Sequence, residues 1–334
     1  MKVCVIGNGG REHALAWRLS ISPSVTKVYA IPGSAAMSDC AELVGIDWQQ
    51  SDHLIGFLKD NQVDLVVVGP EAPLVAGLAD VLNKAGIPVF GPSKAAAQLE
   101  GSKVFAKDLM KKYNIPTAAY GVFHNVEEAK AFIATTGAPI VVKADGLAAG
   151  KGVVVAMTID EANVAVEDML SGNRFGEAGS TVVIEEFMEG EEASLLAFVD
   201  GKTVVPMIAS QDHKRIFDGD KGPNTGGMGT YAPAPVLTDA LRDEAMKTIL
   251  EPMVAAMQKE GMPYVGCLYA GLMITPQGPK VVEFNARFGD PETQVVLPLL
   301  DSDLGQIMMA CATGNLTADM VKWKDSSAAC VILA

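Results

Sequence analysis

Three polar residues near the end of the chain occupy alternate positions: Glu283, Asn285 and Arg287. The apolar run before them predicts a strand, whose alternate side chains share a face, so that Phe284 points into the core. A carboxylate and an amide oxygen at this spacing suit Mg²⁺, which commonly combines few protein ligands with substrate phosphates. Arg287 could pair with a carboxylate or phosphate through two hydrogen bonds. The alternative, a solvated strand end with a surface salt bridge, is less attractive for three such residues.

A glycine-rich segment with a lysine on each side, KADGLAAGKGVVV (143–155), could bind phosphate. It is not a Walker A loop, which needs four residues between its glycines and a hydroxyl after its lysine. Here three residues separate Gly146 from Gly150, and Gly152 follows Lys151. The valines that come next predict a strand, so the unit is a strand, a glycine loop and a second strand.

A second phosphate-type turn, Gly7-Asn-Gly-Gly10, follows the first apolar run and precedes a helix. Backbone N–H groups at a helix N-terminus bind anions. Glu12 stands where a dinucleotide fingerprint has its third glycine, and the next strand ends in Ile31-Pro-Gly33 without an acid for a ribose. The turn therefore either binds a phosphate that is not part of NAD or is a tight strand–helix connection.

Three further stretches each allow two interpretations. Gly69-Pro-Glu71 and Gly91-Pro-Ser93 end two strands, where a parallel sheet places its ligand crevice, but simple turn chemistry also explains them. The acidic run Glu185–Glu192 follows an apolar strand. It is either a solvated turn or a hinge whose backbone meets adenine, with a carboxylate near the ribose.

The elements that must position these residues fall into two patterns. Before residue 90, continuous apolar runs that end at glycine or proline alternate with helical patterns, which predicts a doubly wound α/β domain with a parallel sheet. Its strands are expected at 2–7, 27–33, 64–70 and 88–93, and its helices at 11–20, 52–61 and 75–85.

After residue 100, helices and strands follow in a less regular order. Thr158-Ile-Asp-Glu161 is a capping box that starts a helix, and residues 212–235 predict a long structureless loop of functional importance. The final run SSAACVILA predicts the start of a strand. Other helices are expected at 102–113, 126–136, 239–261, 292–300 and 303–313, and strands at 139–143, 181–187, 193–199, 203–210, 266–274 and 279–285.

Composition excludes several classes of protein. The net charge of −14 over 334 residues gives no general attraction for nucleic acid. No apolar stretch is long enough to span a membrane, and the N-terminus lacks the pattern of a signal peptide, so we expect no membrane contact and a cytoplasmic protein. The five scattered cysteines form no C-x-x-C pair and are expected to be buried free thiols.

The order of these features resembles the ATP-grasp enzymes: Lys103 before a helix, Lys143 on a strand, the glycine loop, the acidic hinge and the motif at 283–287. Longer strings resemble one family among them, the glycinamide ribonucleotide synthetases, also called phosphoribosylamine–glycine ligases, and the resemblance runs across essentially the whole chain. The strings are GNGGREHALAW (7–17), GPEAPL (69–74), QLEGSK (98–103), KADGLAAGKGV (143–153), SQDHKR (210–215), GPNTGGMG (222–229) and EFNARFGDPETQ (283–294).

This resemblance implies a mixed α/β fold. A Rossmann-like domain would span residues 1–100, and an ATP-grasp domain of two α+β subdomains would span 101–313, with a lid subdomain at about 119–190. Residues 314–334 would begin a C-terminal domain that is truncated here. Because that domain helps to wall the cleft in the family, the chain as printed is expected to bind ATP yet turn over poorly.

The resemblance also implies a reaction: ATP, glycine and 5-phosphoribosylamine give glycinamide ribonucleotide, ADP and phosphate through a glycyl phosphate, in purine biosynthesis. The partners would be these small molecules with Mg²⁺ or Mn²⁺, in a monomer or weak homodimer. A metal-binding acid that many ATP-grasp enzymes carry on the preceding strand has no counterpart in Leu268–Ile274, which leaves a second metal ion open.

Site residues follow from the resemblance. Glu283 and Asn285 would bind the metal. ATP would be bound by Lys103, Lys143, Gly150, Lys151, Gly152, Glu185, Glu186, Phe187, Met188 and Glu192. Catalysis would involve Arg287 on the glycine carboxylate, Asp290 on its ammonium, and Asp212, His213 and Lys214 by the acyl phosphate. The second substrate would contact Gly9, Gly10, Arg11, Pro70, Glu71, Gly226, Gly227, Met228 and Arg287.

Three other functions remain open. Another ATP-grasp ligase or carboxylase would release ADP with a different small acid. A nicotinamide-dependent oxidoreductase is disfavoured by Glu12, and absence of NAD binding in calorimetry would exclude it. A nucleotide-binding regulator without turnover is disfavoured by the presence of Lys143, Glu283, Asn285 and Arg287 together.

Overall fold

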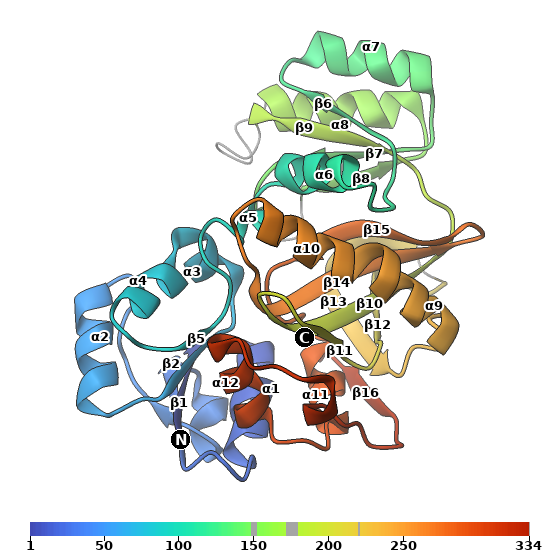
Figure 1. Ribbon diagram of the computed structural model, residues 1–334. Helices are drawn as coiled ribbons and strands as arrows, with labels where there is room; N and C mark the ends of the chain where they lie inside the picture. Colours follow the sequence, from blue (N-terminus) through green and yellow to red (C-terminus); the bar gives the residue numbers. More distant parts are fainter. Residues whose placement is uncertain (148–151, 172–179, 220, 334) are drawn as a thin grey trace.

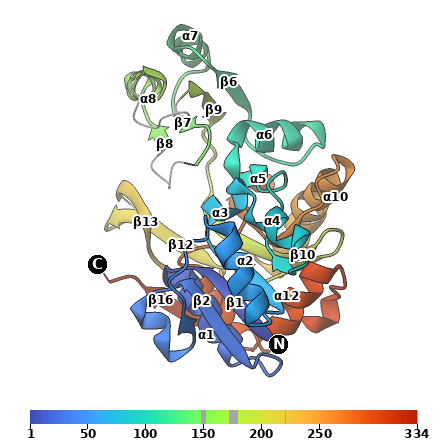
Figure 2. The same ribbon diagram turned by 90° about the vertical axis from the view of Figure 1, so that its left-hand side faces the viewer.

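The computed structural model describes residues 1–147, 152–171, 180–219 and 221–333. A subdomain of residues 120–186, called the lid below for its place in the view, lies above a central antiparallel sheet, and a parallel sheet lies below that sheet (Figure 1 and Figure 2). This mixed α/β architecture confirms the predicted fold class. Within the described ranges, none of the helices combines the length and the apolar character needed to cross a membrane.

The N-terminal sheet is parallel, with strand order β3-β2-β1-β4-β5. Cys4 and Ile6 of β1 enter one hydrophobic core while Val3 and Val5 enter another, which explains why the strands read as unbroken apolar runs. The strands are β1 (Lys2–Gly7), β2 (Lys27–Pro32), β3 (Glu42–Leu43), β4 (Leu65–Val68) and β5 (Val89–Phe90).

The helices of this domain are α1 (Gly10–Ser20), α2 (Ser51–Asp60), α3 (Glu71–Ala76) and α4 (Leu78–Lys84). The prediction of one helix over 75–85 is wrong, because the chain turns at Gly77, whose φ of 97° ends α3. A residue in the left-handed conformation cannot continue a right-handed helix, and glycine adopts that conformation without steric cost.

The lid subdomain is a four-stranded sheet in the order β6-β9-β7-β8, with its own core beneath two helices. The predicted capping box is confirmed: Glu161 N donates to Thr158 Oγ1 over 3.2 Å, and the Glu161 carboxylate accepts from Thr158 N over 3.3 Å. The elements are β6 (Tyr120–Phe123), α7 (Val126–Thr136), β7 (Ile140–Ala144), β8 (Val153–Ala156), α8 (Ile159–Ser171) and β9 (Val182–Glu186).

The central sheet has the order β11-β10-β14-β15. Its strands are β10 (Glu191–Asp200), β11 (Val204–Pro206), β14 (Val265–Thr275) and β15 (Gly278–Asn285). The helices around it are α5 (Gln98–Gly101), α6 (Lys103–Lys112), α9 (Asp239–Ala245), α10 (Glu251–Lys259), α11 (Thr293–Leu299) and α12 (Leu304–Thr313), with a π-helical turn at Met246–Leu250 that joins α9 to α10. Helix α11 packs against α1 and so ties the two halves of the chain together.

The predicted structureless loop at 212–235 is wrong. Strands β12 (Gln211–Phe217) and β13 (Lys221–Ala232) form an antiparallel hairpin, and β16 (Ala328–Val331) pairs with β13. Backbone pairing holds a strand even where glycines and prolines hide the alternation of side chains. The predicted strand at the end of the chain is confirmed by β16. All five cysteines are free thiols as expected, but only Cys4, Cys267 and Cys311 are buried, whereas Cys40 and Cys330 are half-buried.

Candidate active site

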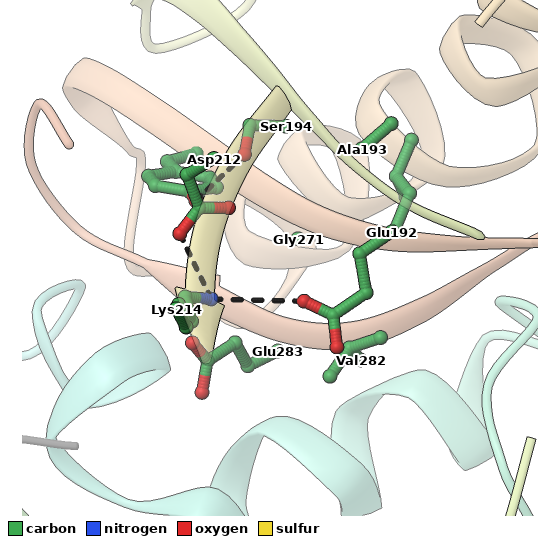
Figure 3. Close-up of a pocket in the computed structure, with 10 residues that line it drawn as sticks. Glu192, Ala193, Ser194, Asp212, Lys214, Gly271, Val282 and Glu283 are labelled. Atoms are coloured by element: carbon green, nitrogen blue, oxygen red, sulfur yellow. Dashed lines mark hydrogen bonds and ion pairs between the residues drawn. The ribbon is translucent and has the colours of Figure 1, made fainter. Parts of the chain in front are cut away.

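A small cavity lies where the hairpin crosses the central sheet (Figure 3). Its volume of about 10 Å³ is roughly the space of one water molecule. Strands β10, β12, β14 and β15 supply its walls, so side chains that are distant in sequence converge there. Its polar lining consists of Glu192, Ser194, Asp212, Lys214, Tyr269 and Glu283.

Lys214 is the cation of this cavity. Its Nζ lies 3.5 Å from Asp212 Oδ2 and 3.7 Å from Glu192 Oε2, as Figure 3 shows. Burial alone would lower the pKa of Lys214, but the charges of Asp212 and Glu192 outweigh burial and raise the pKa above its ordinary value. Lys214 is therefore a permanent positive charge beside two carboxylates.

Glu283 stands among cations from three different elements. Burial tends to raise the pKa of its carboxyl, but Lys214, Lys143 and Lys103 lower it below the ordinary value. Phe284 is buried in the core, as the strand pattern predicted, and Asn285 Oδ1 accepts a long hydrogen bond of 3.4 Å from Arg287. An ionised carboxylate surrounded by lysines suits a site that receives phosphate together with a metal ion.

The guanidinium of Arg287 has a partner at each of its nitrogens. Nε lies 3.3 Å from Glu71 Oε2, Nη2 lies 3.0 Å from Glu100 Oε1, and Nη1 donates to Phe288 O over 3.1 Å. Glu100, which the sequence analysis did not select, is almost fully buried, and burial raises its pKa in spite of Arg287. Arg287 can hold a substrate carboxylate only by exchanging one of these partners.

A buried ion cluster joins the lid to the central part of the chain. Glu185 Oε2 lies 3.1 Å from Lys143 Nζ and 3.0 Å from Lys107 Nζ. Lys143 also donates to Val282 O over 3.1 Å, and Lys107 to Thr117 Oγ1 over 2.8 Å. Burial lowers the pKa of Lys107 to about 8. Lys107 was missed by sequence reasoning, because a lysine in a helical pattern gives no sign that it is buried.

Asp145, which follows β7 and which the sequence analysis did not select, binds the start of α6. Asp145 Oδ1 accepts from the backbone N–H of Lys103 over 2.6 Å and of Val104 over 3.2 Å. The ammonium of Lys103 donates to Gly146 O over 3.0 Å. The loop after β7 is thus fastened to the helix that presents Lys103.

Two predicted ATP-binding residues, Gly150 and Lys151, lie outside the described residues. Gly152 is described, and its carbonyl accepts from Ala144 N over 2.8 Å at the base of β7 and β8. In the hinge, Glu186 Oε2 accepts from Ala119 N over 3.2 Å. Phe187 and Met188 are half-buried, and Glu192 is exposed.

The N-terminal turn is closed by acids. Glu12 Oε2 accepts from Gly9 N over 2.8 Å, and its Oε1 lies 2.5 Å from Arg11 Nε. Asp290 Oδ2 accepts from Arg11 N over 3.2 Å, so the structure brings Asp290 to the start of α1. Glu71 reaches both Arg287 and Arg11, whose Nη1 lies 3.9 Å away.

The hairpin sorts its residues onto two faces. Asp212 and Lys214 line the small cavity, whereas His213 and Met228 line a separate hollow of about 300 Å³ beside β16. The structure therefore separates His213 from the two residues grouped with it. A Cβ at Gly227 would lie 2.6 Å from Pro291 Cδ, so Gly227 lets the hairpin approach the segment that carries Asp290.

The predicted substrate contact Pro70 precedes α3, and Gly10 is the first residue of α1. Gly226 lies on β13 beside Gly227. These residues surround the N-terminal turn and the hairpin rather than the small cavity. The predicted site is therefore spread over two neighbouring regions, which Arg287 and Glu71 join.

Two family models cover most of the chain. The N domain of phosphoribosylglycinamide synthetase matches residues 1–100, and its ATP-grasp (A) domain matches residues 101–293. The chain belongs to the phosphoribosylglycinamide synthetase family. The phosphoribosylamine–glycine ligase of Rhizobium meliloti is 54% identical over the whole chain, which covers 79% of that relative.

Solved structures agree with this membership. The phosphoribosylamine–glycine ligase of Thermotoga maritima superposes with a TM-score of 0.86 at 33% identity, covering 100% of this chain and 80% of that one. The biotin carboxylase domain of 2-oxoglutarate carboxylase from Hydrogenobacter thermophilus superposes with a TM-score of 0.73 at 18% identity, covering 98% of this chain and 73% of that one. The second likeness concerns the fold alone. As a member of the synthetase family, the chain is an ATP-grasp ligase.

Proposed function

We propose that this chain joins glycine to 5-phosphoribosylamine through a glycyl phosphate, forming glycinamide ribonucleotide, ADP and phosphate for purine biosynthesis. The observation that carries the proposal is the convergence of Lys103, Lys143 and Lys214 on Glu283. Three cations around one carboxylate would neutralise the charge of a polyphosphate, and the carboxylate would bind the metal ion that accompanies it. The names of the relatives supply the two substrates.

ATP would lie between the lid and the central sheet. Lys103 and Lys143 would bind the α- and β-phosphates. Phosphate oxygens would then replace Gly146 O as the partner of Lys103 and Glu185 as the partner of Lys143. The adenine would meet the hinge residues Glu186, Phe187 and Met188, and Glu192 would reach the ribose. The segment with Gly150, Lys151 and Gly152 would cover the phosphates.

Glu283 and Asn285 would hold Mg²⁺ or Mn²⁺. Their donor atoms fit such an ion, since a carboxylate and an amide oxygen are both hard ligands. Within the described ranges, no group of three or more His, Cys, Asp or Glu side chains could hold a metal, so phosphate and water would complete the shell. When bound, the ion would neutralise phosphate charge and polarise the phosphoryl group in transfer.

The chain's own residues would align the reactants. Lys214 would stabilise charge on the transferring phosphoryl group and the acyl phosphate, beside Asp212. Arg287 would bind the glycine carboxylate after releasing Glu71 or Glu100, and Asp290 would bind its ammonium. His213 faces the neighbouring hollow, and a role for it would require the hairpin to move.

Phosphoribosylamine would bind at the N-terminal turn. Gly9, Gly10 and Arg11 would hold its phosphate, provided that Asp290 leaves the N–H of Arg11. The remaining contacts would come from Pro70, Glu71, Gly226, Gly227, Met228 and Arg287. The domain limits would be 1–100, 101–313 and 314–334, and the protein would be a cytoplasmic monomer or weak homodimer.

Substrate-dependent ADP release tests this function. Wild-type chain should release ADP with glycine and freshly prepared phosphoribosylamine, and form glycinamide ribonucleotide in equal amount. Glu283→Ala should abolish both products without unfolding the chain. Comparable ADP release with other small acids, and none with glycine, would instead identify a different ATP-grasp ligase.

A further inference from the structure

Amide formation in the proposed reaction releases a proton that needs an acceptor. The amine nitrogen forms a bond to the acyl carbon, the bond from that carbon to the phosphate oxygen breaks, and phosphate leaves with the electron pair. The nitrogen then gives up one proton. Formation of the glycyl phosphate needs no such acceptor, because an ionised carboxylate attacks the γ-phosphate and ADP leaves.

Behind the small cavity lies a carboxylate with no assigned role. Glu292 is only 2% exposed, and its Oε1 accepts from the hydroxyl of Tyr269 over 2.6 Å. The hydroxyl of Ser194 lies 2.8 Å from that of Tyr269 and 3.4 Å from Glu292 Oε1. Tyr269 and Ser194 both line the cavity, so two hydroxyls connect it to the buried acid.

The second oxygen of Glu292 is buried and has no hydrogen-bond partner among the described residues. A buried carboxylate oxygen without a partner is costly when charged, so this group readily takes up a proton. A Cβ at Gly289 would lie 2.2 Å from this oxygen and 2.9 Å from the Tyr269 ring. Gly289 therefore provides the space that the tyrosine–glutamate pair needs.

Burial and the charge of Asp212 act on the pKa of Glu292 in the same direction. Burial raises the pKa of its carboxyl, and the negative charge of Asp212 raises it further, while the hydrogen bond from Tyr269 and the charge of Lys214 lower it by less. The other ionisable groups that face it are Tyr269 and Arg287. A glutamate with a raised pKa is a stronger base than an ordinary one and is therefore better suited to accept a proton from an amine.

We propose that Glu292 is the terminal proton acceptor of amide formation, reached from the cavity through the hydroxyl of Tyr269. The amine proton passes to the tyrosine oxygen as the tyrosine proton passes to Glu292. The tyrosine is therefore unchanged, and Glu292 gains the proton that the amine loses. Phosphate release and substrate exchange then return the proton to solvent. This inference rests on the proposed ligase function.

The test separates the two chemical steps. Hydroxylamine reacts with acyl phosphates without help from a base, so glycyl hydroxamate reports glycyl phosphate formation, while glycinamide ribonucleotide reports amide formation. Glu292→Gln keeps an acceptor for the Tyr269 hydroxyl but takes up no proton. We expect it to slow ribonucleotide formation about 10²- to 10⁴-fold while hydroxamate formation stays within about twofold of wild type.

Two further variants guard against a purely structural effect. Tyr269→Phe should give the same split with a smaller loss. Glu167→Gln, an exposed residue on α8, is the matched control and should change neither product. In wild type, the rate of amide formation should fall as the pH drops through the raised pKa of Glu292, and Glu292→Gln should lose this dependence.

The outcomes are distinguishable. Equal loss of hydroxamate and ribonucleotide in Glu292→Gln, or full retention of both, would overturn the proton-acceptor role. A wild-type chain that makes neither product, even at the low rate expected of it, would overturn the proposed ligase function itself.

Discussion

The substitution Lys107→Met tests how the lowered pKa of Lys107, in the ion cluster under the lid, affects the free energy of unfolding. Lys107 is buried, with its Nζ 3.0 Å from Glu185 Oε2 and 2.8 Å from Thr117 Oγ1. Burial lowers its pKa from the ordinary 10.5 to about 8, even though Glu185 opposes that change. At about 1.36 kcal/mol per pH unit, keeping Lys107 protonated costs the folded chain about 3 kcal/mol at pH 7.

The sign of the pH dependence follows from this. Because the folded pKa lies below the unfolded one, the unfolded chain binds more protons between pH 8 and 10.5, and wild-type stability gains over that window. Methionine does not titrate. The free energy of unfolding of Lys107→Met minus that of wild type should therefore fall by about 3 kcal/mol between pH 7 and pH 10.5. Losses of stability that do not depend on pH, such as the loss of the hydrogen bond to Thr117, are the same at pH 7 and pH 10.5 and cancel when the two differences are compared.

Urea unfolding followed by circular dichroism between pH 7 and 10.5 measures the difference. The matched control is Lys112→Met, because the exposed Lys112 pairs with Glu260, which raises its pKa. A group with a raised folded pKa keeps its contribution until the pH passes its ordinary value, so the control difference should stay flat across the window. A flat difference for Lys107→Met as well would refute the reasoning.

Two other predictions concern packing and substrate binding. A Cβ at Gly69 would lie 2.2 Å from the buried Glu12 carboxylate, so Gly69→Ala should cost about 1–3 kcal/mol in urea unfolding, whereas Gly45→Ala, whose Cβ meets no described atom within 4 Å, should stay within about 0.5 kcal/mol. Equal effects would contradict the packing argument. Arg287→Lys loses the planar fork and should lower kcat/KM for glycine about 10- to 100-fold with little change in the KM for ATP. An unchanged kcat/KM for glycine would show that Arg287 serves only to join Glu71 and Glu100.

Local patterns in the sequence determined much of the architecture. The apolar run of β1 predicted a strand buried on both faces, and Val3 and Cys4 do enter different cores. The capping box at Thr158 and the core position of Phe284 also followed from spacing alone. Such features depend on neighbours within a few residues, and that is the range over which periodicity carries information.

The tertiary structure decided the rest, because pairing between distant segments leaves no local periodicity. The β12–β13 hairpin was hidden by its glycines, and only its pairing reveals that Lys214 and His213 face different hollows. Lys107 and Glu185 are 78 positions apart, and Tyr269 and Glu292 come from different elements. The burial of these pairs, and the perturbed pKa values of Lys107 and Glu292, therefore arise only when the chain folds. Residue types and motif order determined which chemistry was available, whereas the environment of each charge was set by the packing around it.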